Sequence, residues 1–247
     1  MPGSLVRKLE QFTRLTEAEK QIIMAAPTRS RQVGAGQDIV ADGSRPTDIS
    51  LISDGFACRY KLLGDGRRQI LAFVIPGSIC DLRALLLRRM DYGVAALSPC
   101  RVSVIPHQKL FGMLEENPRL NQGLWADTML DAAIYRQWLT NVGRHSAYER
   151  IAHLLCEMCS RLHAIGLADN GSFRLPVTQT DIGDATGLST VHVNRTLQEL
   201  RHDGLVTWRS DIVVVLDWER LKDAAEFDAI YLASDYAGAT SGQKTIT

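Results

Sequence analysis

Residues 178–202 constrain this chain more than any other stretch, because they combine two helix-start signals with a glycine between them. Thr178 and Asp181 have the spacing of a capping box, in which the hydroxyl and the acid satisfy the first amides of a helix. Gly187 suits the end of that helix, because glycine adopts a positive φ without steric cost. Ser189 suits the N-cap of a second helix. The apolar stripe of this second helix recurs at i, i+4 and i+7: Val193, Leu197 and Leu200.

The outward face of the second helix is mostly polar, and its residues can donate to or accept from base edges. A helix-turn-helix places such a face in the DNA major groove. The alternative is an ordinary αα-hairpin with a solvated polar face, and the two helices alone do not separate these interpretations. The residues left on this face are Thr190, Val191, Asn194, Arg195 and Gln198.

The residues after the second helix favour the first interpretation. Leu205–Trp208 and Ile212–Leu216 predict two strands, the second rich in β-branched residues, with a turn at 209–211. A helix-turn-helix followed by a β-hairpin is a winged module. Arg209 lies at the tip of the predicted hairpin, where it could contact a phosphate.

Length and composition set the class of protein. The 247 residues allow one large or two modest domains, and 45% hydrophobic with 23% charged residues is ordinary for a globular chain. No apolar run is long enough to span a membrane and no signal-peptide pattern begins the sequence, so we expect a cytoplasmic protein. The net charge is +0. DNA binding would therefore depend on a few placed contacts and on dimerisation, not on a broad positive field.

The chain before residue 144 divides into a β-rich part and a helical part. From about residue 31 to 106, short β-type runs alternate with Gly and Pro, and Asp65-Gly66 is a hairpin signal, which predicts a β-barrel or sandwich after a short helix around Glu17–Ala25. Residues 108–142 predict a long helix with a break near Pro118. Its apolar residues spread over more than one face, which fits either a partner helix or burial within one monomer. Residues 141–145 predict a hinge, and 146–149 form a capping box.

This order of parts resembles the Crp/Fnr superfamily of bacterial transcription regulators over about residues 10–230. The matching segments are Phe56–Lys61 with Gly64–Ile70, Pro76-Gly77, and Thr178–Leu205. The resemblance implies an α+β chain with a cyclic-nucleotide-binding-type β-roll over 1–115, a dimerisation helix and hinge over 116–143, and a winged helix-turn-helix over 144–233. Residues 234–247 are expected to be a disordered tail. A homodimer on a two-fold-symmetric DNA operator, with RNA polymerase as a further partner, is also implied.

The resemblance also implies roles for residues of the second helix and its surroundings. The family's base-reading positions fall on Thr190, Val191, Asn194 and Arg195, and the arginine suits a bidentate contact with guanine. Val191 departs from the Glu of many members, which changes the expected specificity, for example towards a thymine methyl. The expected phosphate-positioning residues are Thr178, Gln179, Ser189, His192 and Arg209, although a solvated, neutral His192 is an equal alternative.

The effector pocket is expected to be degenerate. Nucleotide-binding relatives use a Gly-Glu-Leu segment for the ribose and an Arg-Ser pair for the cyclic phosphate. Here the corresponding residues are Cys80 and Asp81, after Pro76-Gly77, and Met90 and Asp91. An acid facing a phosphate, with no aligned arginine, is repulsive, so cAMP binding is disfavoured and the effector is unknown. Arg88 and Arg89 are the nearest substitutes, but solvated loop arginines are the commoner case.

The cysteines and the remaining motifs indicate neither a metal site nor an enzyme. No cysteine precedes Cys58 to hold an iron–sulfur centre, and Cys156 and Cys159 form a C-x-x-C inside a predicted helix without a second ligand pair. We expect no metal and no cofactor, and no pattern here requires catalysis. Two rival interpretations remain: a thiol redox sensor using Cys80 or the Cys156–Cys159 pair, and a small-molecule-binding module whose C-terminal domain docks protein instead of DNA.

Overall fold

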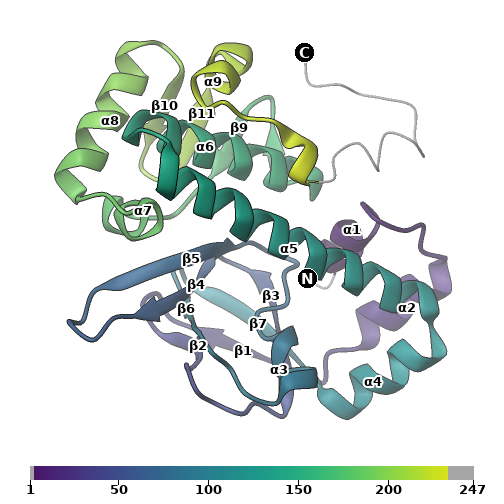
Figure 1. Cartoon of the computed structure of the whole chain (residues 1–247). Coiled ribbons are helices and arrows are strands. Elements are labelled where there is room, and N and C mark those ends of the chain that lie inside the picture. The colour runs from purple at the N-terminus through teal and green to yellow at the C-terminus, as the bar shows by residue number, and fades with distance from the viewer. Residues whose placement is uncertain (1–2, 233–247) are drawn as a thin grey trace. The chain divides into compact units, whose positions relative to one another are not determined.

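The computed structural model describes residues 3–232, and the expected tail at 234–247 lies outside the described residues. The chain forms two compact units, residues 1–129 and 130–247. The boundary falls within one long helix, α5 (Pro118–Arg144), shown in Figure 1. Within residues 3–232, every helix is too short or too polar to cross a membrane.

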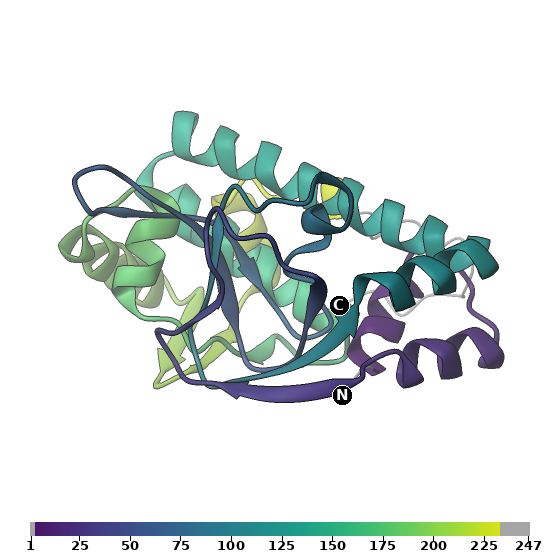
Figure 2. The ribbon, with the colours of Figure 1, turned by 90° about the horizontal axis from the view of Figure 1, so that it is seen from below.

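The first unit is built on two antiparallel sheets, which Figure 2 shows from below. One sheet has the order β1-β7-β3 and the other β2-β6-β4-β5. Their strands are β1 (Arg29–Val33), β2 (Asp38–Val40), β3 (Asp48–Asp54), β4 (Ala57–Leu62), β5 (Arg68–Val74), β6 (Gly93–Ala96) and β7 (Cys100–Pro106). The β-type runs predicted from about residue 31 to 106 are confirmed, since all seven of these strands lie between Arg29 and Pro106.

The hairpin signal at Asp65-Gly66 joins β4 to β5 as predicted. The amide of Leu63 donates to the Arg67 carbonyl at 2.8 Å, and the amide of Gly66 donates back to Leu63 at 2.9 Å. Gly66 has a φ of +85°, which a side chain would strain. The apolar residues of the two sheets meet between them in a buried cluster that includes Ile52, Val94 and Val102.

Three helices pack at one end of this unit, side by side in Figures 1 and 2: α1 (Gly3–Leu9), α2 (Glu17–Ala25) and α4 (His107–Glu116). They share a second buried cluster with the start of α5, to which Leu9, Ile23, Leu110 and Leu120 contribute. The α2 bounds match the predicted helix, and Pro118 separates α4 from α5 as predicted. The short α3 (Leu82–Leu87) lies between β5 and β6 in the sequence and was not predicted.

The second unit is the predicted winged module with additions. After α5, its elements are α6 (Ala147–Ala164), β8 (Ala168–Asp169), β9 (Ser172–Arg174), α7 (Gln179–Thr186), α8 (Thr190–His202), β10 (Val206–Arg209), β11 (Ile212–Val215), α9 (Trp218–Ala224) and the 3-10 helix η1 (Ala229–Leu232). The wing hairpin is extended to the four-stranded order β10-β11-β9-β8. Strands of two or three residues carry no alternation in sequence, which is why β8 and β9 were missed.

The chain between α5 and α6 differs from the expected hinge. Gly143 lies inside α5, which continues to Arg144, so the helical break is confined to His145 and Ser146. The capping box predicted at 146–149 is confirmed: the Ser146 hydroxyl accepts from the Glu149 amide, and the Glu149 carboxylate accepts from the Ser146 amide. This cap sets where α6 begins, whereas a single glycine facing solvent does not interrupt α5.

Replacing Gly183 by Ala is expected to destabilise the second unit. A Cβ at this position of α7 would lie 2.6 Å from the Leu188 carbonyl oxygen, so the turn before α8 must shift. We expect a loss of about 1 to 3 kcal/mol of unfolding free energy, measured by urea denaturation. The control is Gly112→Ala in α4, where a Cβ meets nothing within 4 Å and helix propensity predicts no loss. Equal effects for the two variants would contradict the tight α7–α8 turn.

Candidate nucleic-acid interface and sensor loop

The two helices of the winged module are capped as their sequence predicts. The Thr178 hydroxyl accepts from the Asp181 amide, and the Asp181 carboxylate accepts from the Thr178 amide. Helix α7 ends at Gly187, whose φ is +71°, and the Ser189 hydroxyl accepts from the His192 amide to begin α8. These caps fix where α7 ends and where α8 begins.

The inward face of α8 is buried against the rest of the second unit. Val193 and Leu200 have no exposed surface, and α8 contacts α6. Arg150 of α6 ties the surrounding backbone together, donating to the carbonyl of Thr186 at 2.9 Å and to that of His145 at 2.8 Å. One guanidinium thus joins the end of α7 to the break between α5 and α6.

The outward face of α8 carries an ordered set of side-chain hydrogen bonds. Arg195 donates to Nε2 of His192 at 3.1 Å, and its Nε lies 3.6 Å from a Glu199 oxygen. Asn194 donates to the Gln179 side chain at 3.2 Å and accepts from Gln198 at 3.0 Å. Asn194 and Arg195 are therefore held in defined orientations although both are exposed.

The apolar exception on this face is Val191, which is 79% exposed. Thr190 lies beside it at the first position of α8 and is exposed as well. A side chain this exposed contributes no hydrophobic burial to the fold. Its apolar surface suits contact with a thymine methyl group. All four expected base-reading residues thus lie on the outward side of α8 within six positions.

The expected phosphate-positioning residues surround this face. Thr178, Gln179 and Ser189 are exposed at the starts of α7 and α8, where unpaired helix amides attract anions. Arg209 ends β10 and is exposed at the wing turn, where Ser210 has a φ of +55°. His192 is half-buried and accepts from Arg195, so it is engaged with a side chain of its own helix.

The loop expected to hold an effector is occupied by contacts within the first unit. The amides of Gly77, Ser78 and Cys80 all donate to backbone carbonyls, those of Ile52, Ile75 and Ser50. Gly77 has a φ of +89°, and a Cβ on it would lie 2.6 Å from the Ser4 carbonyl oxygen of α1. The amides of the segment expected to face a ribose are therefore used within the fold itself.

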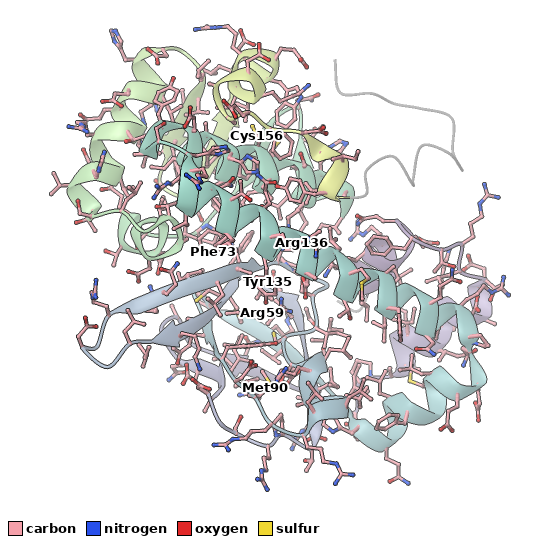
Figure 3. All side chains as sticks on the ribbon, in the orientation of Figure 1. Arg59, Phe73, Met90, Tyr135, Arg136 and Cys156 are labelled. Carbon is pink, nitrogen blue, oxygen red and sulfur yellow. The ribbon has the colours of Figure 1, made fainter. Side chains whose placement is uncertain are left out.

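A buried arginine that the sequence analysis did not single out also faces this loop. Arg59 of β4 is 5% exposed and donates to the carbonyls of Ile79 at 3.0 Å and Cys80 at 3.4 Å. Its guanidinium also lies over the Tyr92 ring, 5.8 Å from the centroid. Figure 3 labels Arg59 and Met90 within the β-domain. A charged residue inside a predicted strand was the available signal, because such a charge must find buried partners.

The other expected effector positions separate in the structure. Cys80 and Met90 are both buried in the apolar cluster between the sheets, whereas Asp91 is exposed and forms an ion pair with Arg83 at 2.9 Å. Asp81 has no exposed surface, and one of its oxygens accepts from the Ser50 amide at 2.8 Å. Its other oxygen has no hydrogen-bond partner within residues 3–232. Burial raises the pKa of Asp81 to about 6.

A second buried charge, also missed, links this loop to the helical layer of the first unit. Lys8 of α1 lies 2.7 Å from a carboxylate oxygen of Asp127 in α5 and donates to the Ser78 hydroxyl at 3.2 Å. Both Lys8 and Asp127 are buried, so the ion pair is shielded from solvent. The sequence gives no signal for a pair separated by more than a hundred residues.

The cysteines do not have the environment of reactive thiols. All five are free and buried. Burial raises the pKa of the Cys80, Cys156 and Cys159 thiols, to about 11 for Cys159. Figure 3 places Cys156 on α6. A buried neutral thiol is a poor nucleophile and a poor metal ligand, and residues 3–232 contain no group of three or more His, Cys, Asp or Glu side chains placed to hold a metal.

Each of the two units contains a match to a known protein family. The Crp-like helix-turn-helix domain matches residues 149–224, and the cyclic nucleotide-binding domain matches residues 30–117. The chain belongs to the Crp/Fnr family. It is a transcription regulator of this type with a helix-turn-helix DNA-binding domain.

Individual Crp/Fnr relatives match most of the chain. The transcriptional activator protein FnrL of Cereibacter sphaeroides is 29% identical over 205 residues, which cover 81% of each chain. The nitrogen fixation regulation protein FixK of Azorhizobium caulinodans is 28% identical over 179 residues, covering 72% of this chain and 71% of FixK. The structure of FixK2 from Bradyrhizobium japonicum is similar with a TM-score of 0.70 and 27% identity, covering 79% of this chain and 96% of FixK2.

Replacing Asp81 by Asn is expected to remove one pH dependence of stability. The folded protein favours protonated Asp81, so its stability falls as pH rises from about 4 through about 6. The shift from the usual value near 3.8 to about 6 corresponds to about 3 kcal/mol. Urea unfolding at about pH 4 and about pH 8 measures this, and the difference between the two pH values should shrink in Asp81→Asn. An unchanged pH dependence would contradict a buried, under-satisfied Asp81.

Proposed function

We propose that this chain reads a specific DNA sequence through α8 and does so as a homodimer on a two-fold-symmetric operator. The observation that carries the proposal is the ordered polar face of α8, within a matched Crp-like helix-turn-helix domain.

The roles proposed for individual residues follow from their chemistry and exposure. Arg195 would donate its two parallel N–H groups to one guanine, and Asn194 would pair with an adenine. Val191 would contact a thymine methyl, which gives this chain a different preference from relatives with an acid there. Thr178, Gln179, Ser189 and Arg209 would bind phosphates, and His192 would orient Arg195 in addition to any backbone contact.

The proposal of a dimer rests on the exposed stripe of α5. The stripe recurs at alternating steps of three and four residues, the spacing of a coiled-coil seam. Three of its members are large apolar side chains that remain 68%, 58% and 75% exposed: Trp125, Met129 and Leu139. Arg136 is the charged member in its middle. The complete stripe is Gln122, Trp125, Met129, Ala132, Arg136, Leu139 and Gly143.

An exposed stripe of this length is unusual on a monomer and suits an identical helix. The opposite side of α5 is buried, with Leu120, Leu130, Ile134 and Trp138 nearly inaccessible. The two faces that the sequence could not assign are thus distinguishable: one is covered by the chain itself, and we assign the other to a second copy.

The sensor pocket is proposed to be degenerate. The amides of the segment expected to face a ribose are used internally, and Arg59 is fixed to the Ile79 and Cys80 carbonyls. Met90, at the expected phosphate position, is buried in the apolar cluster. Asp81 would add a buried acid to the same region. We therefore infer that cAMP is not the effector. RNA polymerase is the partner expected of a transcription activator, which is how FnrL is described.

Replacing Arg195 by Ala is expected to abolish specific binding. The probe is a duplex that the wild-type chain enriches from a random-sequence pool, and the measurement is fluorescence anisotropy at fixed salt. Loss of one bidentate guanine contact in each half-site predicts a decrease in affinity of at least tenfold. The control is Arg67→Ala in the β4–β5 hairpin, which removes the same charge from an exposed site in the first unit. If Arg195→Ala binds like the control, Arg195 does not contact a base.

Replacing Leu139 by Glu is expected to convert the dimer to a monomer. Two glutamates would face each other in a seam that otherwise buries leucine, at a cost of several kcal/mol in association. Light scattering after size exclusion measures the mass. Thr140→Glu is the control, because Thr140 is exposed at the margin of the stripe. A wild-type monomer, or a Leu139→Glu dimer, would reject this seam.

A further inference from the structure

A single carboxylate in the second unit accepts hydrogen bonds from three elements. Glu157 lies in the middle of α6 and has no exposed surface. Its Oε2 accepts from the indole Nε1 of Trp138 in α5 at 2.9 Å and from the hydroxyl of Tyr231 in η1 at 3.0 Å. Its Oε1 accepts from Arg161 at 2.9 Å, one turn further along α6.

These contacts are strong because the charge is buried. A carboxylate removed from water is costly unless its oxygens are paired, so losing one donor leaves it under-satisfied. Burial and the Glu157 charge both raise the pKa of Tyr231, which keeps its phenol protonated and able to donate. Trp138 of α5 and Tyr231 of η1 are therefore held to the same carboxylate oxygen of α6.

Tyr231 belongs to a segment that lies beyond the matched helix-turn-helix domain, which ends at residue 224. We name residues 225–232 the C-terminal strap. Its Ala225, Phe227 and Leu232 are buried. The ring of His153 in α6 lies against it, with Nδ1 at 3.2 Å from the Ala225 carbonyl oxygen and Nε2 at 3.1 Å from the Tyr231 hydroxyl. The Phe227 ring meets the His153 ring edge-on, with centroids 5.1 Å apart.

The contact of Glu157 with Trp138 lies where α5 meets α6, the helix on which α8 packs. Helix α5 stops at Arg144 and α6 begins at Ala147, so the backbone alone does not fix the angle between them. Helix α6 in turn carries α8 by direct packing and α7 through Arg150. The spacing of two reading helices in a dimer therefore depends on how the end of α5 is held against α6.

We propose that Glu157 is a positioning residue for DNA recognition, and that the C-terminal strap and Trp138 together hold the end of α5 against α6. The strap is then needed for engaging two half-sites at once, and it is not needed for each winged module to fold or to bind one half-site. This inference rests on the proposed function, because it assumes a dimeric reader.

The test compares two duplexes: the enriched duplex with both half-sites, and the same duplex with one half-site scrambled. Tyr231→Phe removes one donor to Glu157 and keeps the aromatic ring, and Trp138→Phe removes the other donor. Each variant is expected to bind the two-half-site duplex roughly tenfold more weakly and to bind the single half-site within about twofold of wild type. Tyr60→Phe is the matched control, because it removes a tyrosine hydrogen bond to a carboxylate, Asp38, in the first unit.

Two further comparisons separate positioning from simple destabilisation. A chain ending after Leu232 should bind like the full chain, whereas one ending after Glu226 should bind like Tyr231→Phe. Glu157→Gln keeps an oxygen that accepts from both Trp138 and Tyr231, so it should recover most of the two-site affinity that Glu157→Leu loses. Circular dichroism at the assay temperature confirms that each variant tested is folded.

The outcomes are distinct. Equal losses on both duplexes, or no loss on either, would overturn the positioning role while leaving DNA recognition intact. Failure of the wild-type chain to enrich any duplex from the random-sequence pool would instead reject the proposed function.

Discussion

The second unit depends on the packing of α8 against α6. Burial of Val193, Leu197 and Leu200 fixes the rotation of α8, and this rotation decides that Val191, Asn194 and Arg195 face outward. Arg150 and Glu157 then connect α6 to α7, to the end of α5 and to the C-terminal strap. The outward face of α8 is therefore held in place through α6 and its partners, although its own residues are exposed.

In the first unit, buried polar side chains of the chain itself contact the expected ligand loop at residues 76–81. Lys8 pairs with Asp127 and donates to Ser78, Arg59 donates to two carbonyls of the loop, and Asp81 within the loop accepts from the Ser50 amide. A buried polar side chain that loses its partner raises the free energy of the fold. A ligand entering this loop would therefore have to replace those contacts. The cyclic nucleotide-binding domain is thus present, and its loop is held by hydrogen bonds within the first unit.

Sequence predicted most of the elements, but not short ones such as α3, β8 and β9, and it missed the tertiary contacts between elements. Caps, turn glycines and periodic apolar residues are local signals, which is why Thr178, Gly187, Ser189 and the hairpin at Asp65-Gly66 were placed correctly. The break between α5 and α6 was placed too early, because Gly143 was given more weight than the continuing helix. Arg59, Lys8, Glu157 and Tyr231 act through partners distant in sequence, and a single chain offers no pattern for such pairs. The assigned DNA and effector roles remain predictions.

The central claim is that two copies of α8 read one DNA site across a two-fold axis. Selection of duplexes from a random-sequence pool by the full-length chain tests this most directly, because both sequence and symmetry emerge from the same data. The account predicts an enriched inverted repeat with half-site centres about 10 base pairs apart, one turn of DNA. Enrichment of a single unrepeated motif, or no enrichment at all, would contradict it.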